Sequence, residues 1–447
     1  MKLNKFFLMF AIGLGLFACS ENELEGNGPE GVQNEGTTYV GFSLKFNDAN
    51  TRADVESATE EESNITSAYV MMTSKGGTTF EKVLSFTNPV TKEEGYYQEY
   101  EKFLFQTTAG NHDFYAVINP DVAPVVGGNI VEYFNTAQAL DLTTIAADNN
   151  FMMSNCEKST FNLVDNVTKE QALEGNDNAS NNFIISVERV VAKVTMTCTN
   201  PTLESTSGIT DVGGEISNLQ FYLMGEATKS YRMASTSNLN LVRTTEGIKD
   251  RYRIESGSIS EGGISITVGA GQDKTKAIPV YCLENLQDEY KQGNTTYILL
   301  KTDFIPTKIV NCTNGTIIDN DNATDVAESF YVVKSGNLAG NYIIKSDLEA
   351  YKQSNEDQLP QGVLSISDEY KKGTCWFGPI WVGQQNADNN GPVKRNTWYN
   401  LNIATIKLPG DPTTPEINED QPLVPNTNVA ITLDILDWVS ADRNITL

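Results

Sequence analysis

Apolar and polar residues alternate along most of the chain, in runs separated by Gly, Asn, Asp and Pro clusters. Such alternation is typical of half-buried strands in antiparallel sheets. Two segments, 135–142 and 347–353, are expected to form short helices, because neither repeats its apolar positions beyond two turns. The pattern predicts a mostly β protein with few short helices. The clearest predicted strands are Phe114–Ile118, Val187–Thr195, Leu219–Leu223, Thr296–Lys301 and Trp398–Ile403.

A polar segment interrupts this pattern near the middle of the chain. Residues 200–208 read Asn-Pro-Thr-Leu-Glu-Ser-Thr-Ser-Gly, which is the composition of a linker or a long loop. We therefore predict a domain boundary near residue 203, with one β-sandwich domain over 53–203 and a second over 204–408. No segment repeats at a fixed short period, so neither a solenoid nor a propeller is indicated.

The first 19 residues have the pattern of a lipoprotein signal peptide. Two lysines precede an apolar run, Phe6–Ala18, and Cys19 follows it directly. The run is about 13 residues long, whereas a helix needs about 20 to cross a bilayer. Because a small residue before Cys19 is what a lipoprotein signal peptidase requires, we expect acyl chains such as palmitate on Cys19 and a precursor anchored at the outer membrane. The alternative is an ordinary signal peptide with an incidental cysteine.

A further predicted strand, 39–46, lies between Cys19 and a lone arginine, Arg52. Arg52 and Ala53 stand in a polar, acidic stretch, where a protease can reach the bond that joins them. Residues 20–52 are therefore predicted to be a propeptide that is cut off after Arg52 and carries the strand away. The alternative is a loop arginine without a role. The residues on one face of this strand are Val40, Phe42, Leu44 and Phe46.

A spacer and another apolar-faced strand end the chain. Residues 409–426 hold five of the 15 prolines and should be extended and semi-stiff. Residues 427–447 follow, and their alternation predicts a strand that can be donated to another copy. The apolar residues of this donor strand are Val429, Ile431, Leu433 and Ile435, followed by Trp438.

The two ends together suggest polymerisation by strand exchange. Loss of the strand at 39–46 would expose an apolar groove with unpaired backbone edges, and such a groove recruits a replacement strand. The C-terminal strand of another copy has the required alternation. Because a head-to-tail contact of this kind does not close on itself, it builds a filament.

Charge and cysteine content narrow the classes of partner. The net charge of −26 argues against binding to nucleic acid. Beyond Cys19 the chain has five cysteines and no CxxC, which argues against a disulfide framework. The single histidine, His112, is interpreted as a surface turn residue, and one histidine excludes multi-histidine metal sites.

The remaining motifs give no sign of catalysis. The acidic segment Asp319–Asp325 lacks the glycine and glutamate of an EF-hand, although a weak cation site there stays open. The aromatic residues Trp376, Phe377 and Trp381 are expected in the core rather than on a sugar-binding platform. Neither GxSxG nor a Walker A motif nor a GxGxxG motif followed by a helix occurs. We therefore predict no enzyme, no cofactor and no metal, with a glycosidase as a distant possibility.

The chain resembles the fimbrillins of type V pili, and most closely the shaft subunit of minor fimbriae. The resemblance covers nearly the whole length and depends on the order of its segments rather than on any single one. A departure is Asp437, where proline is expected, and it leaves the local bend there open. Besides the leader and the Arg52–Ala53 junction, the matching segments are Phe114–Pro120, Val187–Lys193, Tyr290–Leu299, Val393–Tyr399 and the end with Trp438.

This resemblance implies two tandem transthyretin-like β-sandwich domains and polymerisation by exchange of the C-terminal strand. It also implies lipidation at Cys19, an Arg-specific protease that cuts after Arg52, and a place in the fimbrium on the cell surface. The implied partners are further copies of the chain, accessory anchor and tip subunits, and host or bacterial surface receptors. Anchor subunits are expected to lack the arginine cut and tip subunits the usable terminal strand, so the chain is expected to be a shaft subunit that supports adhesion. The alternative is a surface lipoprotein that binds glycan or host protein and never polymerises.

Overall fold

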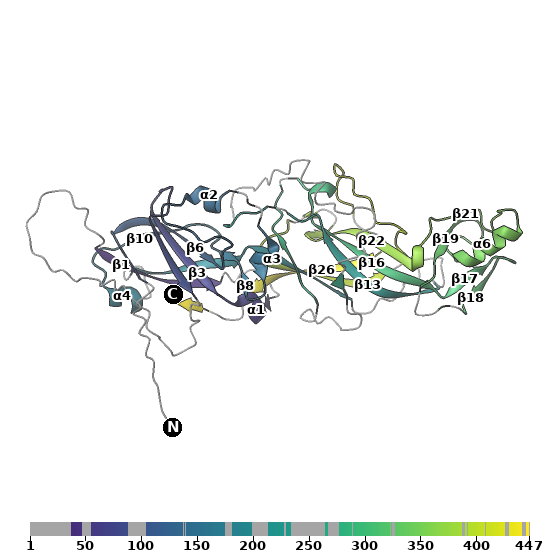
Figure 1. Cartoon of the computed structure of the whole chain (residues 1–447), viewed down its shortest axis with the longest axis horizontal. Coiled ribbons are helices and arrows are strands. Elements are labelled where there is room, and N and C mark those ends of the chain that lie inside the picture. Colours follow the sequence, from purple (N-terminus) through teal and green to yellow (C-terminus); the bar gives the residue numbers. More distant parts are fainter. Residues whose placement is uncertain are drawn as a thin grey trace, which may run out of the picture. The chain divides into compact units, whose positions relative to one another are not determined.

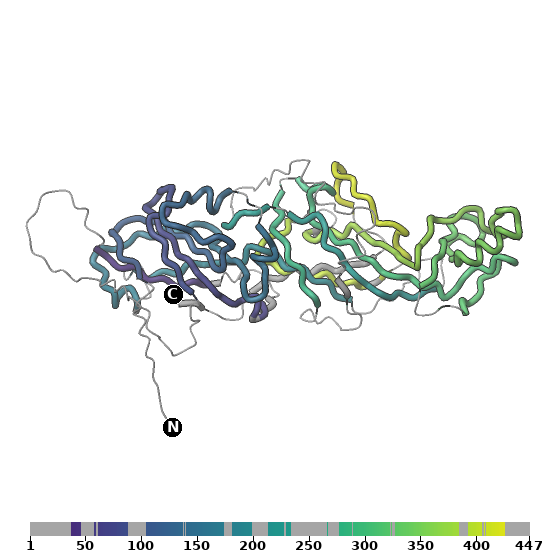
Figure 2. Tube along the Cα trace, viewed as in Figure 1, coloured from purple at the N-terminus to yellow at the C-terminus, as the bar shows by residue number. Residues whose placement is uncertain are grey.

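A nine-stranded sheet holds most of the N-terminal half in the computed structural model, in the order β27-β1-β11-β9-β6-β3-β4, with β10 beside β6 and β5 beside β1. The first of its strands along the chain, β1, runs parallel to β11, which lies far away in the sequence. Figure 2 traces the chain, coloured along the sequence. The sheet thus contains both the N-terminal and the C-terminal strand of the described chain. Its strands are β1 (Thr38–Phe46), β3 (Ser67–Ser74), β4 (Lys82–Thr87), β5 (Leu104–Thr107), β6 (Gly110–Ile118), β9 (Met153–Ser154), β10 (Ser159–Leu163), β11 (Asn182–Arg189) and β27 (Asn444–Thr446).

The structure describes only part of the 447 residues. The described residues are 37–46, 55–87, 104–136, 138, 140–174, 181–198, 213–227, 229–233, 264–266, 277–287, 289–321, 323, 327–386, 389–390, 392–406, 408–424, 429–439 and 444–446. Only the backbone is described at 46, 55–57, 60, 174, 264–265, 384–386, 389–390, 405, 429–439 and 444–446.

Two further sheets, built mainly from residues after Val190, share one core (Figure 1). Buried residues of β12 and β25 in the first of them pack with buried residues of β13, β16 and β22 in the second. Apolar faces turned toward each other in this way form a sandwich. The five-stranded sheet, in order, is β15 (Val280–Leu283), β12 (Val191–Cys198), β25 (Thr397–Ile406), β26 (Val429–Val439) and β2 (Val55–Ser57). The four-stranded sheet is β14 (Ile264–Ser265), β13 (Gly214–Met224), β16 (Tyr297–Pro306) and β22 (Thr374–Trp381).

Short elements complete the described chain. The longest helix among the described residues is α6, with 10 residues, and none of the described helices is long and apolar enough to cross a membrane. The helices are α1 (Glu60–Ser63), α2 (Ile130–Phe134), α3 (Leu142–Ile145), α4 (Lys169–Glu174), α6 (Lys345–Ser354) and the 3-10 turns η3 (Gln292–Asn294) and η4 (Lys371–Gly373). The small sheets are β7 (Ala146–Ala147) with β8 (Asn150–Phe151), β17 (Lys308–Asn311) with β18 (Thr316–Asp319), β19 (Phe330–Ser335) with β20 (Tyr342–Ile344) and β21 (Ser365–Ile366), and β23 (Gln384–Asn386) with β24 (Asn389–Asn390).

The prediction of a mostly β protein with few short helices is confirmed, with two local corrections. The expected helix over 135–142 does not form; α2 ends before it and α3 begins at its last residue. The strand expected over 187–195 breaks at Val190, where the chain leaves the nine-stranded sheet and enters the five-stranded one. The predicted boundary near 203 lies outside the described residues.

Candidate functional site

The strand β1 is paired along both of its edges. On one edge Gly41–Phe46 runs parallel to β11, and on the other edge the first half of β1 pairs with β5 and the second half with β27. The predicted strand at 39–46 therefore forms, and it lies inside the sheet rather than at its margin. Its removal would leave unpaired backbone on all three neighbouring strands, which is the condition for adding a strand from outside.

One face of β1 is buried in the core of the nine-stranded sheet. Val40, Phe42 and Leu44 are between 0% and 2% exposed. The ring of Phe42 contacts those of Phe105 and Phe114, with centroids 5.4 and 5.1 Å apart. Burial of three such side chains contributes roughly 5–9 kcal/mol before ordering costs are subtracted. The side chain of the fourth predicted residue, Phe46, lies outside the described part.

A buried hydroxyl fixes the start of β1. The Oγ1 of Thr38 donates to the carbonyl oxygen of Val164 at 2.6 Å. It accepts hydrogen bonds from the Asn181 side-chain amide at 2.9 Å and from the Val167 backbone at 3.2 Å. Asn181 stands at φ 50°, a conformation that asparagine tolerates better than most residues. Since Thr38 is 0% exposed, a side chain without a hydroxyl would leave the buried Val167 N–H unpaired and would remove one hydrogen bond each from Asn181 and Val164.

The opposite face of β1 lies under the helix α4, and Gly41 is where the two approach. A Cβ built on Gly41 would lie 2.1 Å from the carbonyl oxygen of Ala172, which is too close for any side chain unless α4 moves. That oxygen is itself held, because it accepts a hydrogen bond from the Asn182 side chain at 2.7 Å. Any residue other than glycine at position 41 therefore requires α4 to shift, and a larger side chain requires a larger shift. The sequence analysis singled out neither Gly41 nor Thr38; the only signals were a glycine inside the predicted strand at 39–46 and a threonine directly before it.

The structure pairs the predicted donor segment within its own chain. Val429–Val439 forms β26, which runs antiparallel to β25 and parallel to β2. The last described residues, in β27, pair with Ser43–Lys45 of β1. The side chains of Val429, Ile431, Leu433, Ile435 and Trp438 lie outside the described part, as do Cys19, Arg52 and Ala53.

A buried ion pair lies near the junction of α1 and the five-stranded sheet. Glu62 and Lys193 are 2.8 Å apart, and their side chains are 3% and 6% exposed. Tyr281 donates a hydrogen bond to Glu62 at 2.7 Å, and the ammonium of Lys193 lies 4.0 Å from the ring centre of Trp398. Burial raises the pKa of Glu62, but the charge of Lys193 and the hydrogen bonds outweigh it, so the pKa is lowered. The carboxylate is thus held ionised by its partners, which suits a structural pair.

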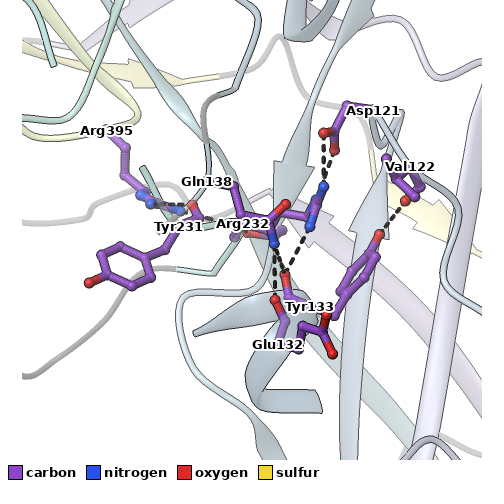
Figure 3. Close-up of polar contacts among 9 residues, drawn as sticks. Asp121, Val122, Glu132, Tyr133, Gln138, Tyr231, Arg232 and Arg395 are labelled. Carbon is purple, nitrogen blue, oxygen red and sulfur yellow. Dashed lines mark hydrogen bonds and ion pairs between the residues drawn. The ribbon is translucent and has the colours of Figure 1, made fainter. Parts of the chain in front are cut away.

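A second polar cluster holds the segment 229–233 against both halves of the chain (Figure 3). Arg232 donates two hydrogen bonds of 2.8 Å to the Asp121 carboxylate and one of 3.1 Å to the carbonyl of Tyr133. From the other side Arg395 donates to the carbonyl oxygens of Tyr231 and Arg232. Arg395 also contacts the Glu284 carboxylate. Both arginines are thus directed at protein groups, and the arrangement joins chain segments rather than forming an open site.

The other candidate residues are built into the fold. His112 is only 4% exposed and belongs to β6, so its interpretation as a surface turn residue was wrong; every residue of β6 from His112 to Ile118 is buried. Trp376, Phe377 and Trp381 are at most 8% exposed, which confirms their expected place in the core. Within the described ranges no three His, Cys, Asp or Glu side chains gather as a metal site would require.

One family model matches the C-terminal part of the chain. Residues 368–444 match the family model "Major fimbrial subunit protein type IV, Fimbrillin, C-terminal". This region holds β22, β25 and β26, so the C-terminal part of the chain is similar to the C-terminal part of fimbrillins. No curated protein matches the chain by sequence.

Several solved structures also resemble the chain. A fimbrilin (fimA) from Porphyromonas gingivalis W83 has 16% identity and a TM-score of 0.47, with 91% of this chain and 99% of that one covered. A proposed cell adhesion protein from Parabacteroides distasonis ATCC 8503 has 15% identity and a TM-score of 0.48, with 91% and 98% covered. The tip fimbrial protein Mfa3 from Porphyromonas gingivalis has 13% identity and a TM-score of 0.39, with 90% and 100% covered. At such identities and TM-scores the likeness does not establish a function.

Proposed function

We propose that this protein is a structural subunit of a fimbrial shaft and supports adhesion at the cell surface. It is exported as a lipoprotein acylated at Cys19, cut after Arg52, and polymerised when the C-terminal strand of one copy takes the place of β1 in the next. Accessory anchor and tip subunits would complete the filament. The fimbrillin match over residues 368–444 supports the class of protein.

The observation that carries this proposal is the position of β1. Among the described elements only β1 precedes Arg52, so a single cut after that residue disconnects it from everything else. Yet β1 is paired on both edges and buries Val40, Phe42 and Leu44. Its loss leaves a groove whose exposed apolar surface and open ladders are costly in water. A strand from another copy removes that cost.

The pairing of the C-terminal strand within its own chain is consistent with a precursor that does not polymerise before it is cut. While β26 pairs with β25 and β2, it is not available to a neighbour. The tip of the chain, β27, pairs with β1 itself. Loss of β1 therefore removes a partner of the donor end at the same time as it opens the acceptor groove. In this proposal one cut prepares both ends of the subunit.

The burial of the aromatic residues argues against the alternative of a tethered glycan-binding lipoprotein. Its aromatic platform would need Trp376, Phe377 and Trp381 at the surface, and all three are buried. The proposed function therefore rests on assembly rather than on a ligand site.

An Arg52→Ala variant tests the proposal directly. Purified wild-type precursor and the variant are treated with an Arg-specific protease and followed by light scattering and negative-stain electron microscopy. We expect filaments from the wild type and none from Arg52→Ala. Lys45→Ala is the matched control, because Lys45 is the one other basic residue in 20–52, and it should polymerise like the wild type. Filaments from uncleaved Arg52→Ala would contradict the proposal.

A further inference from the structure

Two positions of β1 restrict what can replace it. Position 38 needs a hydroxyl, because Thr38 is 0% exposed and makes three hydrogen bonds through Oγ1. Position 41 favours a small residue, because a Cβ placed there lies 2.1 Å from the Ala172 carbonyl oxygen unless α4 shifts, and a branched side chain would need a larger shift. Both requirements come from the parts of the chain that stay after the cut, namely α4, Val164 and Asn181. They therefore apply equally to an incoming strand.

We propose that the C-terminal strand of a second copy enters this groove in one register, with Ala430 at the position of Gly41 and Thr427 at the position of Thr38. This inference rests on the proposed function. The sequence Thr-Asn-Val-Ala-Ile-Thr-Leu-Asp-Ile over 427–435 then lies where Thr-Tyr-Val-Gly-Phe-Ser-Leu-Lys-Phe lies over 38–46. The buried hydroxyl, the small residue and every apolar position coincide.

Other registers in the same direction fail at one or both positions. Sliding the donor by two residues one way places Val429 in the hydroxyl site and Thr432 at position 41. Sliding it by two the other way places Pro425 at position 38 and Asn428 at position 41. A slide by one residue turns the apolar face of the strand outward. Each of these leaves a buried hydrogen-bonding group unpaired or forces a branched side chain against α4.

A donor running in the opposite direction is also disfavoured. With Ala430 kept at position 41, Leu433 would take the hydroxyl site, and Thr427 would take the position of Leu44, which is 0% exposed. One buried polar cluster would lose its partner while a polar side chain entered the core. The donor is therefore parallel to β11, as β1 is.

Ala430 does not fit the position of Gly41 without a shift of α4, so substitutions at residue 430 should change the rate of strand exchange. Its Cβ requires α4 to move away from the strand, whereas the original Gly41 does not. Ala430→Gly should therefore speed strand exchange, and Ala430→Val should slow it by roughly ten- to hundredfold. Thr432→Val is the matched control, because Thr432 would lie at the half-buried position of Ser43, away from α4's contact with Gly41.

Engineered disulfides between the donor strand and β11 can determine the register of the donor strand. Ser43 is the partner of Ile184 across the β1–β11 ladder, and Ile184 is 61% exposed. In a Cys156→Ser background, Ser43→Cys with Ile184→Cys should form an intramolecular disulfide in the uncleaved precursor, which serves as the positive control. After cleavage, Thr432→Cys with Ile184→Cys should give a covalent ladder of oligomers on a denaturing, non-reducing gel. Asp434→Cys and Ala430→Cys, each with Ile184→Cys, report the two slides by two residues.

The outcomes separate the register from the function. A ladder from the Thr432 pair alone supports the inference. Filaments with a ladder from the Asp434 pair or the Ala430 pair would overturn the register and leave strand exchange standing. Filaments with no ladder from any pair would mean that the C-terminal strand does not enter beside β11, which overturns both. Equal polymerisation rates for Ala430→Gly, Ala430→Val and the wild type would also contradict the role given to position 41.

Discussion

Replacing Phe42 with alanine tests how strongly β1 holds the precursor together. The side chain is 2% exposed and contacts the rings of Phe105 and Phe114. A buried phenylalanine replaced by alanine typically costs about 3–5 kcal/mol, since transfer and cavity terms add. We expect a loss of this size in the free energy of unfolding of the N-terminal half.

The assay is urea unfolding of uncleaved protein, followed by near-ultraviolet circular dichroism, in an Arg52→Ala background that keeps β1 attached. Lys45→Ala is the control on the same strand; its side chain is exposed, and its expected effect is under about 0.5 kcal/mol. Once the wild-type chain is cut and β1 has left, Phe42→Ala should make no difference to polymer stability. A Phe42→Ala precursor as stable as Lys45→Ala would refute the burial argument.

Three further predictions concern the buried polar groups and the C-terminus. Lys193→Met should cost about 3–5 kcal/mol at pH 7, because it leaves the Glu62 carboxylate buried without its cation. Because the pKa of Glu62 is lowered from 4.5 in the wild type, the stability from the pair is present above about pH 4.5 and is lost as the pH falls through the lowered pKa. Urea unfolding at about pH 3 should therefore show a smaller difference between variant and wild type than at pH 7, and equal losses at both pH values would contradict this. Asn181→Ala should cost about 1–3 kcal/mol and speed hydrogen exchange of the β1 amides, whereas unchanged exchange would show that Asn181 does not hold the strand. Deletion of residues 428–447 should leave a folded, secreted subunit that forms no filaments, as electron microscopy would show; long filaments would rule out strand donation.

Alternation along the sequence predicted the strands best where one face of the strand is buried and the other is partly exposed to solvent. β1 is of this kind, and its inward residues Val40, Phe42 and Leu44 were identified from the period of two. β12 is different, because all eight of its residues are buried. Its burial pattern therefore does not distinguish an inward face from an outward face. The sequence therefore offered no sign that one run, 187–195, divides at Val190 between two sheets.

The candidate site was predictable in outline and not in its determinants. The pattern identified β1 and the apolar positions of Val40, Phe42 and Leu44. It could not identify Gly41 or Thr38, because their roles depend on α4 and Asn181, which are more than 120 residues away along the chain. Nor could the pattern show that β26 pairs with β25 and β2 in the same chain, because alternation does not specify which strand lies next to it.

The central claim is that one cut converts a lipid-anchored precursor into a polymerising subunit. Its most direct test is N-terminal sequencing and intact-mass measurement of the protein sheared from the cell surface, with electron microscopy of the same fraction. The account predicts filamentous material whose chains begin at Ala53. Chains that begin at an acylated Cys19, in a fraction without filaments, would contradict it and indicate a tethered monomer.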